Sequence, residues 1–475
     1  MPYYRGYGRC ASITEYFIRK YLPDCWIAFL YEGERGEQKE TEEGIFLRRV
    51  KISYNGGMAK CMRFLRWKVT VPAFGLLLVG LYGLELPGSS FLGINSFPQG
   101  IRREAQSLVS TLSLEEKCAS VLLVAFGSTP QLTAEFASRY QKIPVGGVIL
   151  FAYNIPHTAE QLMELTDRVR KVGSESGRIP FIAVDHEGGT VLRLKGIATE
   201  LPSAREIGKS KASPETMRQL YWIVARQLAS LGFSMNLAPV VEPLTEETQP
   251  FLFYRTYSSD PTRITELSEQ FLRAMQEAGV VGVAKHFPGS GEGDPHERLT
   301  RSFAKPSNPA DPYTLSFRSL HKKGVLEALM VSHVQVPQEG VQEPATLSSL
   351  ILQNILREQW GFEGLILTDD MRMKSITQGV DPIEGVVRAI QAGADMVMYL
   401  GGEYPKAHAA LVKAVQEGRL SSQGLDHAVT RILAMKIRYG MIKPHRKELS
   451  PKSERLAEFY RLKREGDALV QHILN

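Results

Sequence analysis

Residues 280–296 read VVGVAKHFPGSGEGDPH, and their layout recurs along the chain. The first five residues form a short apolar run, which is typical of a buried parallel strand. Lys285 and His286 follow at once, and a loop rich in glycine and proline then leads to His296. A strand that delivers titratable side chains into a loop is a common plan for an active site. A solvated loop with incidental polar residues is the alternative.

Similar apolar runs alternate with amphipathic segments from about Ser113 onward, and Ser113 itself is an expected helix N-cap. Strands are predicted at 146–151, 181–184, 234–237, 280–284, 328–331, 365–367 and 396–399. Helices are predicted at 159–172, 214–231, 264–278, 348–360, 382–392 and 426–439. Seven or eight such units predict an α/β fold, a TIM-type (β/α)8 barrel in a single catalytic domain. No Gly-x-Gly-x-x-Gly follows the first strand, which counts against a dinucleotide-binding fold.

Composition narrows the classes of partner. The chain has 475 residues and a net charge of +6, without a long basic run interleaved with aromatics, so no nucleic-acid partner is expected. Its cysteines, Cys10, Cys25, Cys61 and Cys118, show no metal-ligand spacing. We therefore expect neither a disulfide nor a structural zinc in the folded domain.

The N-terminal region has a different character. Residues 1–61 show no sustained helical or strand period, and we expect either that translation starts at Met62 or that this preface is a disordered arm. A basic cluster at 62–68 precedes an uncharged apolar stretch at 69–84. This layout predicts a signal sequence or membrane anchor at 62–86, so the protein is expected to be exported, periplasmic or anchored to the cytoplasmic membrane. A buried core hairpin is the alternative.

Polar clusters follow four of the predicted strands. In a barrel the carboxyl ends of the strands surround one mouth, where catalytic residues gather. The clusters are Asp185-His186-Glu187, Lys285-His286, Ser332-His333 and Asp369-Asp370. Their recurrence at corresponding positions predicts an active site at that mouth.

An ordered set of motifs between residues 112 and 439 carries a family resemblance. The motifs are SLEEK (113–117), GGVILF (146–151), AVDHEGG (183–189), KHFPG (285–289), PATLS (344–348), LREQWGF (356–362), LTDDM (367–371) and AGAD (392–395). The set resembles glycoside hydrolase family 3, and within it the single-domain β-N-acetylglucosaminidase branch. The resemblance implies a family 3 barrel over 100–445, followed by a charged helical tail at 446–475.

The resemblance also implies catalytic roles. Asp369 matches the family's nucleophile, which forms a glycosyl-enzyme ester in retaining hydrolysis. Asp370 is expected to cap the helix that follows it. Asp294 and His296 match the branch's acid/base dyad, in which the aspartate orients the imidazole and stabilises its protonated form. An inert surface histidine is the alternative for His296, because its loop is shorter than in typical members.

Five further residues match positions that bind the hydroxyls of the non-reducing sugar. They are Asp185, Arg193, Arg255, Lys285 and His286. Charged side chains suit this task because they make bidentate contacts with vicinal hydroxyls. A salt bridge at the barrel mouth is the alternative for each of them.

The resulting prediction is a retaining exo-glycosidase that removes terminal β-linked N-acetylglucosamine, with peptidoglycan fragments as the expected substrate. No metal and no organic cofactor is implied, and a monomer is expected. His333 is predicted to be a packing histidine, and the helical tail at 454–474 is predicted to pack on the chain's own surface. A family 3 β-glucosidase, a GlcNAc phosphorylase and a non-catalytic carbohydrate-binding protein remain the alternatives.

Overall fold

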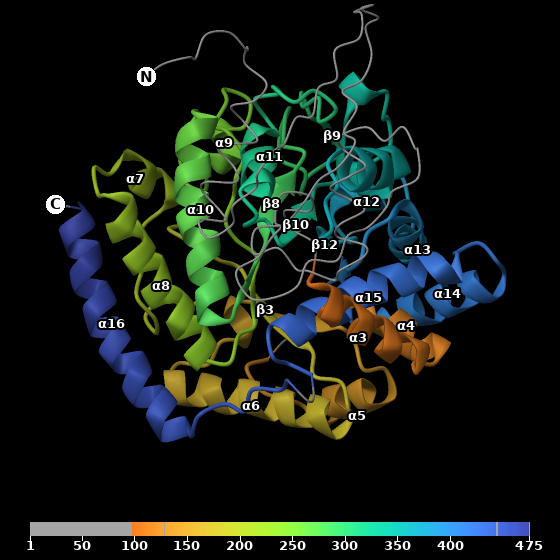
Figure 1. Ribbon diagram of the computed structural model, residues 1–475, viewed down its shortest axis with the longest axis horizontal. Coiled ribbons are helices and arrows are strands. Elements are labelled where there is room, and N and C mark those ends of the chain that lie inside the picture. Colours follow the sequence, from red (N-terminus) through yellow and green to blue (C-terminus); the bar gives the residue numbers. More distant parts are fainter. Residues whose placement is uncertain (1–96, 128, 443–444, 475) are drawn as a thin grey trace, which may run out of the picture. The chain divides into compact units, whose positions relative to one another are not determined.

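The computed structural model describes residues 97–127, 129–442 and 445–474 (Figure 1). The predictions for the preface at 1–61 and for the signal or anchor at 62–86 lie outside these residues. Cys118 is free and buried. Among the described helices, none combines the length and the apolar character that crossing a bilayer requires.

The central strands are short and buried, because their residues are almost all apolar. They are β1 (Leu122–Ala125), β2 (Gly147–Leu150), β3 (Phe181–Val184), β6 (Met235–Asn236), β7 (Val281–Gly282), β8 (Ala284–Phe287), β10 (Ala328–Val331), β12 (Leu365–Thr368) and β13 (Val397–Tyr399). Two small pairs accompany them: β9 (Thr300–Arg301) with β11 (Val334–Gln335), and β4 (His186–Gly188) with β5 (Val191–Leu192).

The central strands form two parallel sheets. One has the order β13-β1-β2-β3-β6-β7, and the other has the order β12-β10-β8. Isolated parallel bridges join Leu367 to Met396 and Val240 to Lys285. The predicted α/β class is thus confirmed, whereas the assigned sheets do not close into one ring and the predicted TIM-type closure is not confirmed.

Helices surround these strands (Figure 1). They are α3 (Gln99–Ser110), α4 (Leu114–Ser120), α5 (Ala134–Lys142), α6 (Ala159–Glu175), α7 (Ala204–Lys209), α8 (Pro214–Ser230), α9 (Gln249–Leu252), α10 (Pro261–Ala278), α11 (Leu315–Lys322), α12 (Lys374–Thr377), α13 (Pro382–Ala392), α14 (Tyr404–Gln416), α15 (Ser422–Arg438) and α16 (Lys452–Leu474). Short 3-10 turns lie at η1 (Ala152–Asn154), η2 (Pro337–Glu339) and η3 (Ala345–Leu347). The predicted helix at 348–360 is present as the π-helix η4 (Leu350–Gln359).

The start of α4 illustrates how the sequence sets a boundary. Glu116 N donates to Ser113 Oγ at 3.2 Å, and Ser113 N donates to Glu116 Oε2 at 2.9 Å. This reciprocal capping box satisfies amide groups that the first turn of a helix leaves without partners. The predicted N-cap at Ser113 is confirmed.

The C-terminal helix α16 packs against α8 on the outside of the domain (Figure 1). Phe459 and Leu462 on its inner face are completely buried, and Leu456 and Leu469 pack beside them. Arg226 on α8 donates two hydrogen bonds to Glu458 of α16, at 3.1 and 2.6 Å. The predicted packing of the tail on the chain's own surface is therefore confirmed.

Candidate active site

The polar clusters predicted to gather at one mouth stand at the carboxyl ends of strands in both parallel sheets, β3 in one and β8, β10 and β12 in the other. Asp185 follows β3, and Asp369 follows β12. The strand predicted at 280–284 is divided at Val283 into β7 and β8, and β8 extends to Phe287, so Lys285 and His286 are part of a strand. In parallel sheets these carboxyl ends lie on one edge, which is where α/β enzymes carry their chemistry.

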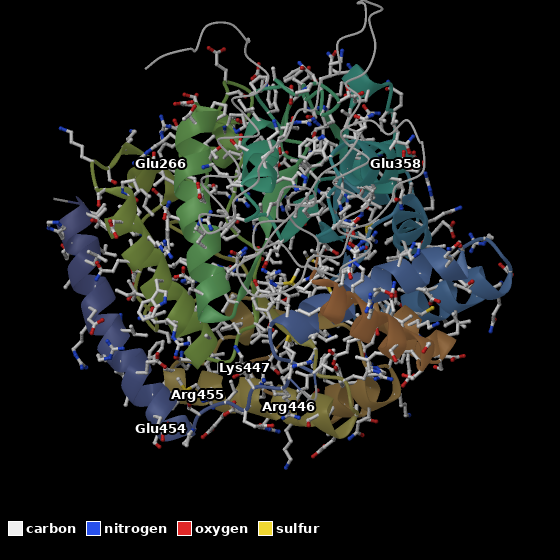
Figure 2. All side chains as sticks on the ribbon, in the orientation of Figure 1. Glu266, Glu358, Arg446, Lys447, Glu454 and Arg455 are labelled. Atoms are coloured by element: carbon white, nitrogen blue, oxygen red, sulfur yellow. The ribbon has the colours of Figure 1, made fainter. Side chains whose placement is uncertain are left out.

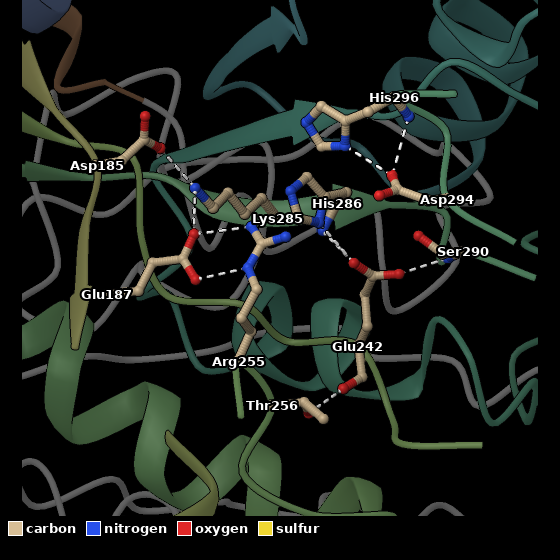
Figure 3. A network of polar contacts seen from close by, with 10 residues as sticks. All are labelled: Asp185, Glu187, Glu242, Arg255, Thr256, Lys285, His286, Ser290, Asp294 and His296. Atoms are coloured by element: carbon tan, nitrogen blue, oxygen red, sulfur yellow. Dashed lines mark hydrogen bonds and ion pairs between the residues drawn. The ribbon is translucent and has the colours of Figure 1, made fainter. Parts of the chain in front are cut away.

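A buried network of four charges occupies one side of this mouth (Figure 3). Lys285 Nζ lies 2.7 Å from Asp185 Oδ1 and 2.7 Å from Glu187 Oε1. Arg255 donates two hydrogen bonds to Glu187, from Nε to Oε2 at 3.0 Å and from Nη2 to Oε1 at 2.9 Å. Two cations and two carboxylates thus balance one another in a site from which water is largely excluded.

The pKa values in this network reflect both burial and pairing. Burial acts to raise the pKa of Glu187, but Lys285 and Arg255 outweigh it and hold the pKa well below its usual value. Burial acts to lower the pKa of Lys285, but Asp185 and Glu187 outweigh it and raise that pKa. Glu187, Lys285 and Arg255 therefore remain charged together at neutral pH. The network brings together Asp185, Lys285 and Arg255, three of the residues predicted to bind the sugar. Glu187, which joins them, had no predicted role.

Arg193 differs from these cations. Within the described residues its guanidinium has no hydrogen bond or ion pair, and its Nε is buried without a partner. Its charge and, more strongly, burial lower the pKa of the neighbouring His186 to about 4. The structure thus leaves Arg193 as a donor with unused capacity beside a neutral histidine.

A second buried cluster centres on Glu242, which no sequence motif singled out. His286 Nδ1 lies 2.6 Å from Glu242 Oε1, and the backbone N–H groups of His286 and Ser290 also donate to this carboxylate (Figure 3). The signal that could have found Glu242 is its position after the apolar residues 237–241, which corresponds to that of Asp185 after β3.

Three histidines influence the ionisation of Asp369. Burial acts to raise the pKa of Asp369, but His286, His333 and His296 together hold it below its usual value. Asp370 N also donates to Asp369 Oδ1 at 2.8 Å, which fixes the carboxylate's orientation. Asp369 is therefore ionised at neutral pH.

Asp370 does not have its predicted role. The helix α12 begins four residues later with Met373 as its N-cap, so the capping prediction is wrong. Asp370 Oδ1 instead accepts from Arg372 N and Leu400 N, each at 3.1 Å, and joins the ends of β12 and β13. Burial raises the pKa of Asp370 to about 6. Two adjacent aspartates therefore have pKa values shifted in opposite directions.

His333 is satisfied on both ring nitrogens. It is completely buried, with Nε2 3.0 Å from the carbonyl oxygen of Asp370 and Nδ1 2.8 Å from Thr346 Oγ1. Since a carbonyl only accepts, Nε2 donates and Nδ1 accepts from the threonine hydroxyl. Burial also lowers the pKa of His333. These contacts agree with its predicted packing role.

Asp294 and His296 form a local pair on the loop after β8. Asp294 Oδ1 lies 2.7 Å from His296 Nδ1 and accepts from His296 N at 2.9 Å. The His296 side chain is 58% exposed, so its Nε2 is open to solvent. An exposed imidazole held in one orientation by a carboxylate can donate and accept protons at Nε2.

Metal chemistry has no evident centre here. The described part of the chain contains no group of three or more His, Cys, Asp or Glu side chains able to hold a metal ion.

Comparison with known proteins adds the family. The model of the glycosyl hydrolase family 3 N-terminal domain matches residues 113–435, more than half of the chain. The chain belongs to glycosyl hydrolase family 3. This confirms the resemblance predicted from the motifs.

Individual proteins similar to this family 3 chain are named as β-hexosaminidases or β-N-acetylglucosaminidases. A β-hexosaminidase of Photobacterium profundum is 34% identical over 268 residues, covering 56% of this chain and 78% of the relative. β-Hexosaminidase A of Pseudoalteromonas piscicida is 28% identical over 338 residues, covering 66% of this chain, and the match spans 56% of that relative's length. A family 3 β-N-acetylglucosaminidase structure from Paenibacillus sp. FPU-7 superposes with a TM-score of 0.66 at 28% identity, covering 74% of this chain and 68% of the other.

Proposed function

We propose that this family 3 chain is a retaining exo-glycosidase that removes terminal β-linked N-acetylglucosamine. Relatives named β-hexosaminidase and β-N-acetylglucosaminidase support this assignment. The observation that carries it is the combination of an ionised carboxylate, Asp369, with an oriented Asp294–His296 pair whose charge acts on that carboxylate. These are the nucleophile and the proton donor that the reaction requires.

In the proposed first step, an Asp369 oxygen attacks the anomeric carbon and the bond to the leaving oxygen breaks. That oxygen takes the proton from Nε2 of the His296 imidazolium, while Asp294 keeps Nδ1–H in place. In the second step, neutral His296 takes a proton from water. The water oxygen attacks the anomeric carbon, and the ester to Asp369 breaks.

The buried charges are proposed to hold the sugar hydroxyls. Asp185 and Lys285 already neutralise each other, so they exchange part of their hydrogen bonding for hydroxyls at little electrostatic cost. Arg193 brings donors that are free in the described structure. His286 is the neighbour of Lys285 on β8, and its charge acts more strongly on the pKa of Asp369 than that of any other histidine.

We also propose that the two sheets belong to one closed TIM-type barrel. β7 and β8 are separated only by Val283, which connects the edge of the six-stranded sheet to the three-stranded sheet. On the other side, the bridge from Leu367 to Met396 connects the end of β12 to the residue before β13. A barrel would surround the mouth with all of the polar clusters.

Peptidoglycan fragments as substrate, export or anchoring through residues 69–84, and a monomeric state are further proposals that rest on the sequence alone.

The activity is tested by comparing 4-nitrophenyl β-N-acetylglucosaminide with 4-nitrophenyl β-glucoside, with and without inorganic phosphate. We expect turnover of the first substrate, with free N-acetylglucosamine as product in both buffers. Preference for the glucoside would indicate a β-glucosidase, and a sugar 1-phosphate product would indicate a phosphorylase. Sugar binding without turnover would indicate a non-catalytic protein.

A further inference from the structure

Glu242 lies at a junction between two parts of the site. Its backbone runs beside β8, since Val241 N donates to Lys285 O at 2.8 Å and Lys285 N donates to Pro239 O at 2.9 Å. Thr256 Oγ1 donates to the carbonyl oxygen of Glu242. Glu242 is only 1% exposed. The backbone of Glu242 is therefore held by hydrogen bonds, and its side chain is buried beside β8.

The two carboxylate oxygens of Glu242 serve different segments (Figure 3). Oε1 accepts from the His286 backbone N at 3.2 Å and faces His286 Nδ1 at 2.6 Å. Oε2 accepts from the backbone N of Ser290. One buried carboxylate thus contacts both a predicted sugar-binding histidine and the first turn of the loop that carries Asp294 and His296.

That loop has a tight neck directly after Ser290. Glu292 N donates to Arg301 O at 2.9 Å. A Cβ atom on Gly291 would lie 2.0 Å from the same carbonyl oxygen, so only glycine allows this approach. On its far side the neck is held by the pairing of β9 with β11, and on its near side it is joined to β8 by the short connection through Ser290. Glu242 is the side chain that fixes this connection.

The charge of Glu242 also matters for His286. Burial acts to raise the pKa of Glu242, but its contacts with His286 and Ser290 hold that pKa below its usual value. An ionised carboxylate only accepts hydrogen bonds, so it keeps a proton on His286 Nδ1 and orients this ring, which acts more strongly than the other histidines in lowering the pKa of Asp369.

We propose that Glu242 is a positioning residue that ties the sugar-binding strand to the acid/base loop. It sets the distance between the bound sugar and the His296 proton donor without touching the substrate. The proposal rests on the proposed glycosidase function for its kinetic consequences, and on geometry alone for its effect on the loop.

The kinetic test uses Glu242→Gln with two N-acetylglucosaminides. One has 4-nitrophenolate as its leaving group, and the other, the methyl glycoside, has the far more basic methoxide. Protonation matters most for the basic leaving group, so a displaced His296 lowers kcat/KM for the methyl glycoside about tenfold or more beyond the loss for the activated one. Glu187→Gln, which alters the charge network around Lys285 and Arg255 rather than the loop connection, is expected to lower both equally. An equal loss in Glu242→Gln would overturn the proposal.

Glu358→Gln is the matched control, because Glu358 is exposed on η4 (Figure 2). It is expected to leave both substrates unaffected. If Glu242→Gln does not fold, Ser290→Pro removes the N–H donor from the loop side and leaves the carboxylate in place. It is expected to give the same discrimination between leaving groups, and equal losses would again overturn the proposal.

Hydrogen exchange gives a readout that does not depend on turnover. In Glu242→Gln, amides in peptides covering 288–301 are expected to exchange several-fold faster than in Glu358→Gln, with β10 unchanged. Unchanged exchange in the loop would overturn the proposal. Exchange in Glu242→Gln can be measured even if the parent protein is inactive. If the loop of Glu242→Gln exchanges faster but the parent protein hydrolyses no N-acetylglucosaminide, the proposed function is refuted and the positioning role of Glu242 is still supported.

Discussion

Replacing Lys285 by methionine tests the buried charge network. The Lys285 and Glu187 side chains are each only 3% exposed, so neither charge is well solvated. Removing one partner of a buried pair typically destabilises a protein by about 3–5 kcal/mol, because the other charge stays buried. Arg255 remains as a second partner of Glu187, whereas Asp185 loses its cation, so we expect a loss of about 3 kcal/mol.

The sign of the pH dependence follows from the pKa of Glu187. Its folded-state pKa lies below the usual 4.5, so its pairing contributes stability above about pH 4.5, and this is lost as pH falls toward the folded pKa. In Lys285→Met only Arg255 still lowers the pKa of Glu187, so the variant loses less stability than the parent as this carboxylate becomes protonated. The difference in unfolding free energy between parent and Lys285→Met should therefore be constant from neutral pH down to about pH 4.5 and shrink as pH falls further toward the folded pKa.

Urea unfolding of both proteins across this pH range measures the difference. Lys406→Met is the control, because Lys406 pairs with Glu403 on the surface and such pairs often contribute nothing measurable. A deficit in Lys285→Met below about 1 kcal/mol at neutral pH would refute the reasoning, as would a deficit that does not shrink below about pH 4.5.

Three further predictions concern the acid/base, the tail and Asp370. His296→Ala should lower kcat/KM far more for basic leaving groups than for 4-nitrophenolate, and steady-state kinetics showing equal losses would contradict a proton-donor role. Phe459→Ala should destabilise the fold by about 3–5 kcal/mol in urea unfolding, since the ring is completely buried, whereas Tyr460→Phe on the exposed side should cost less than about 1 kcal/mol. Because burial raises the pKa of Asp370 to about 6, its ionisation costs folded-state stability as pH rises from about 4 to 6. Asp370→Asn keeps an accepting oxygen and should gain about 1 kcal/mol relative to the parent between pH 5 and pH 8, a gain that urea unfolding at both values would detect.

The sequence was informative wherever an apolar run was bounded by turn residues. The strands at 181–184 and 328–331 have the predicted bounds. β1 was missed because only Val121 separates it from α4, so the apolar residues of helix and strand appear continuous. β8 was predicted too short because Lys285 and His286 are polar residues inside a strand, which hydrophobic patterning cannot recognise.

The candidate site shows the same limit. Motifs in the chain placed Asp369, Asp294 and His296, whose contacts depend on residues close in sequence or on a strand end. Glu242 lies 44 residues before His286, and its role depends on the parallel bridge between Val240 and Lys285, which local patterns do not encode. Asp370 was misassigned because its partner Leu400 directly follows β13 rather than lying in the following helix.

The most direct test of the account is to trap the glycosyl-enzyme. A fluorinated N-acetylglucosamine donor with a good leaving group slows hydrolysis of the intermediate, and peptide mass spectrometry then locates the labelled residue. The account predicts a single ester on Asp369, in the peptide that contains residues 367–371. A label on Asp370 or on any other residue, or full turnover of a parent protein that never becomes labelled, would contradict it.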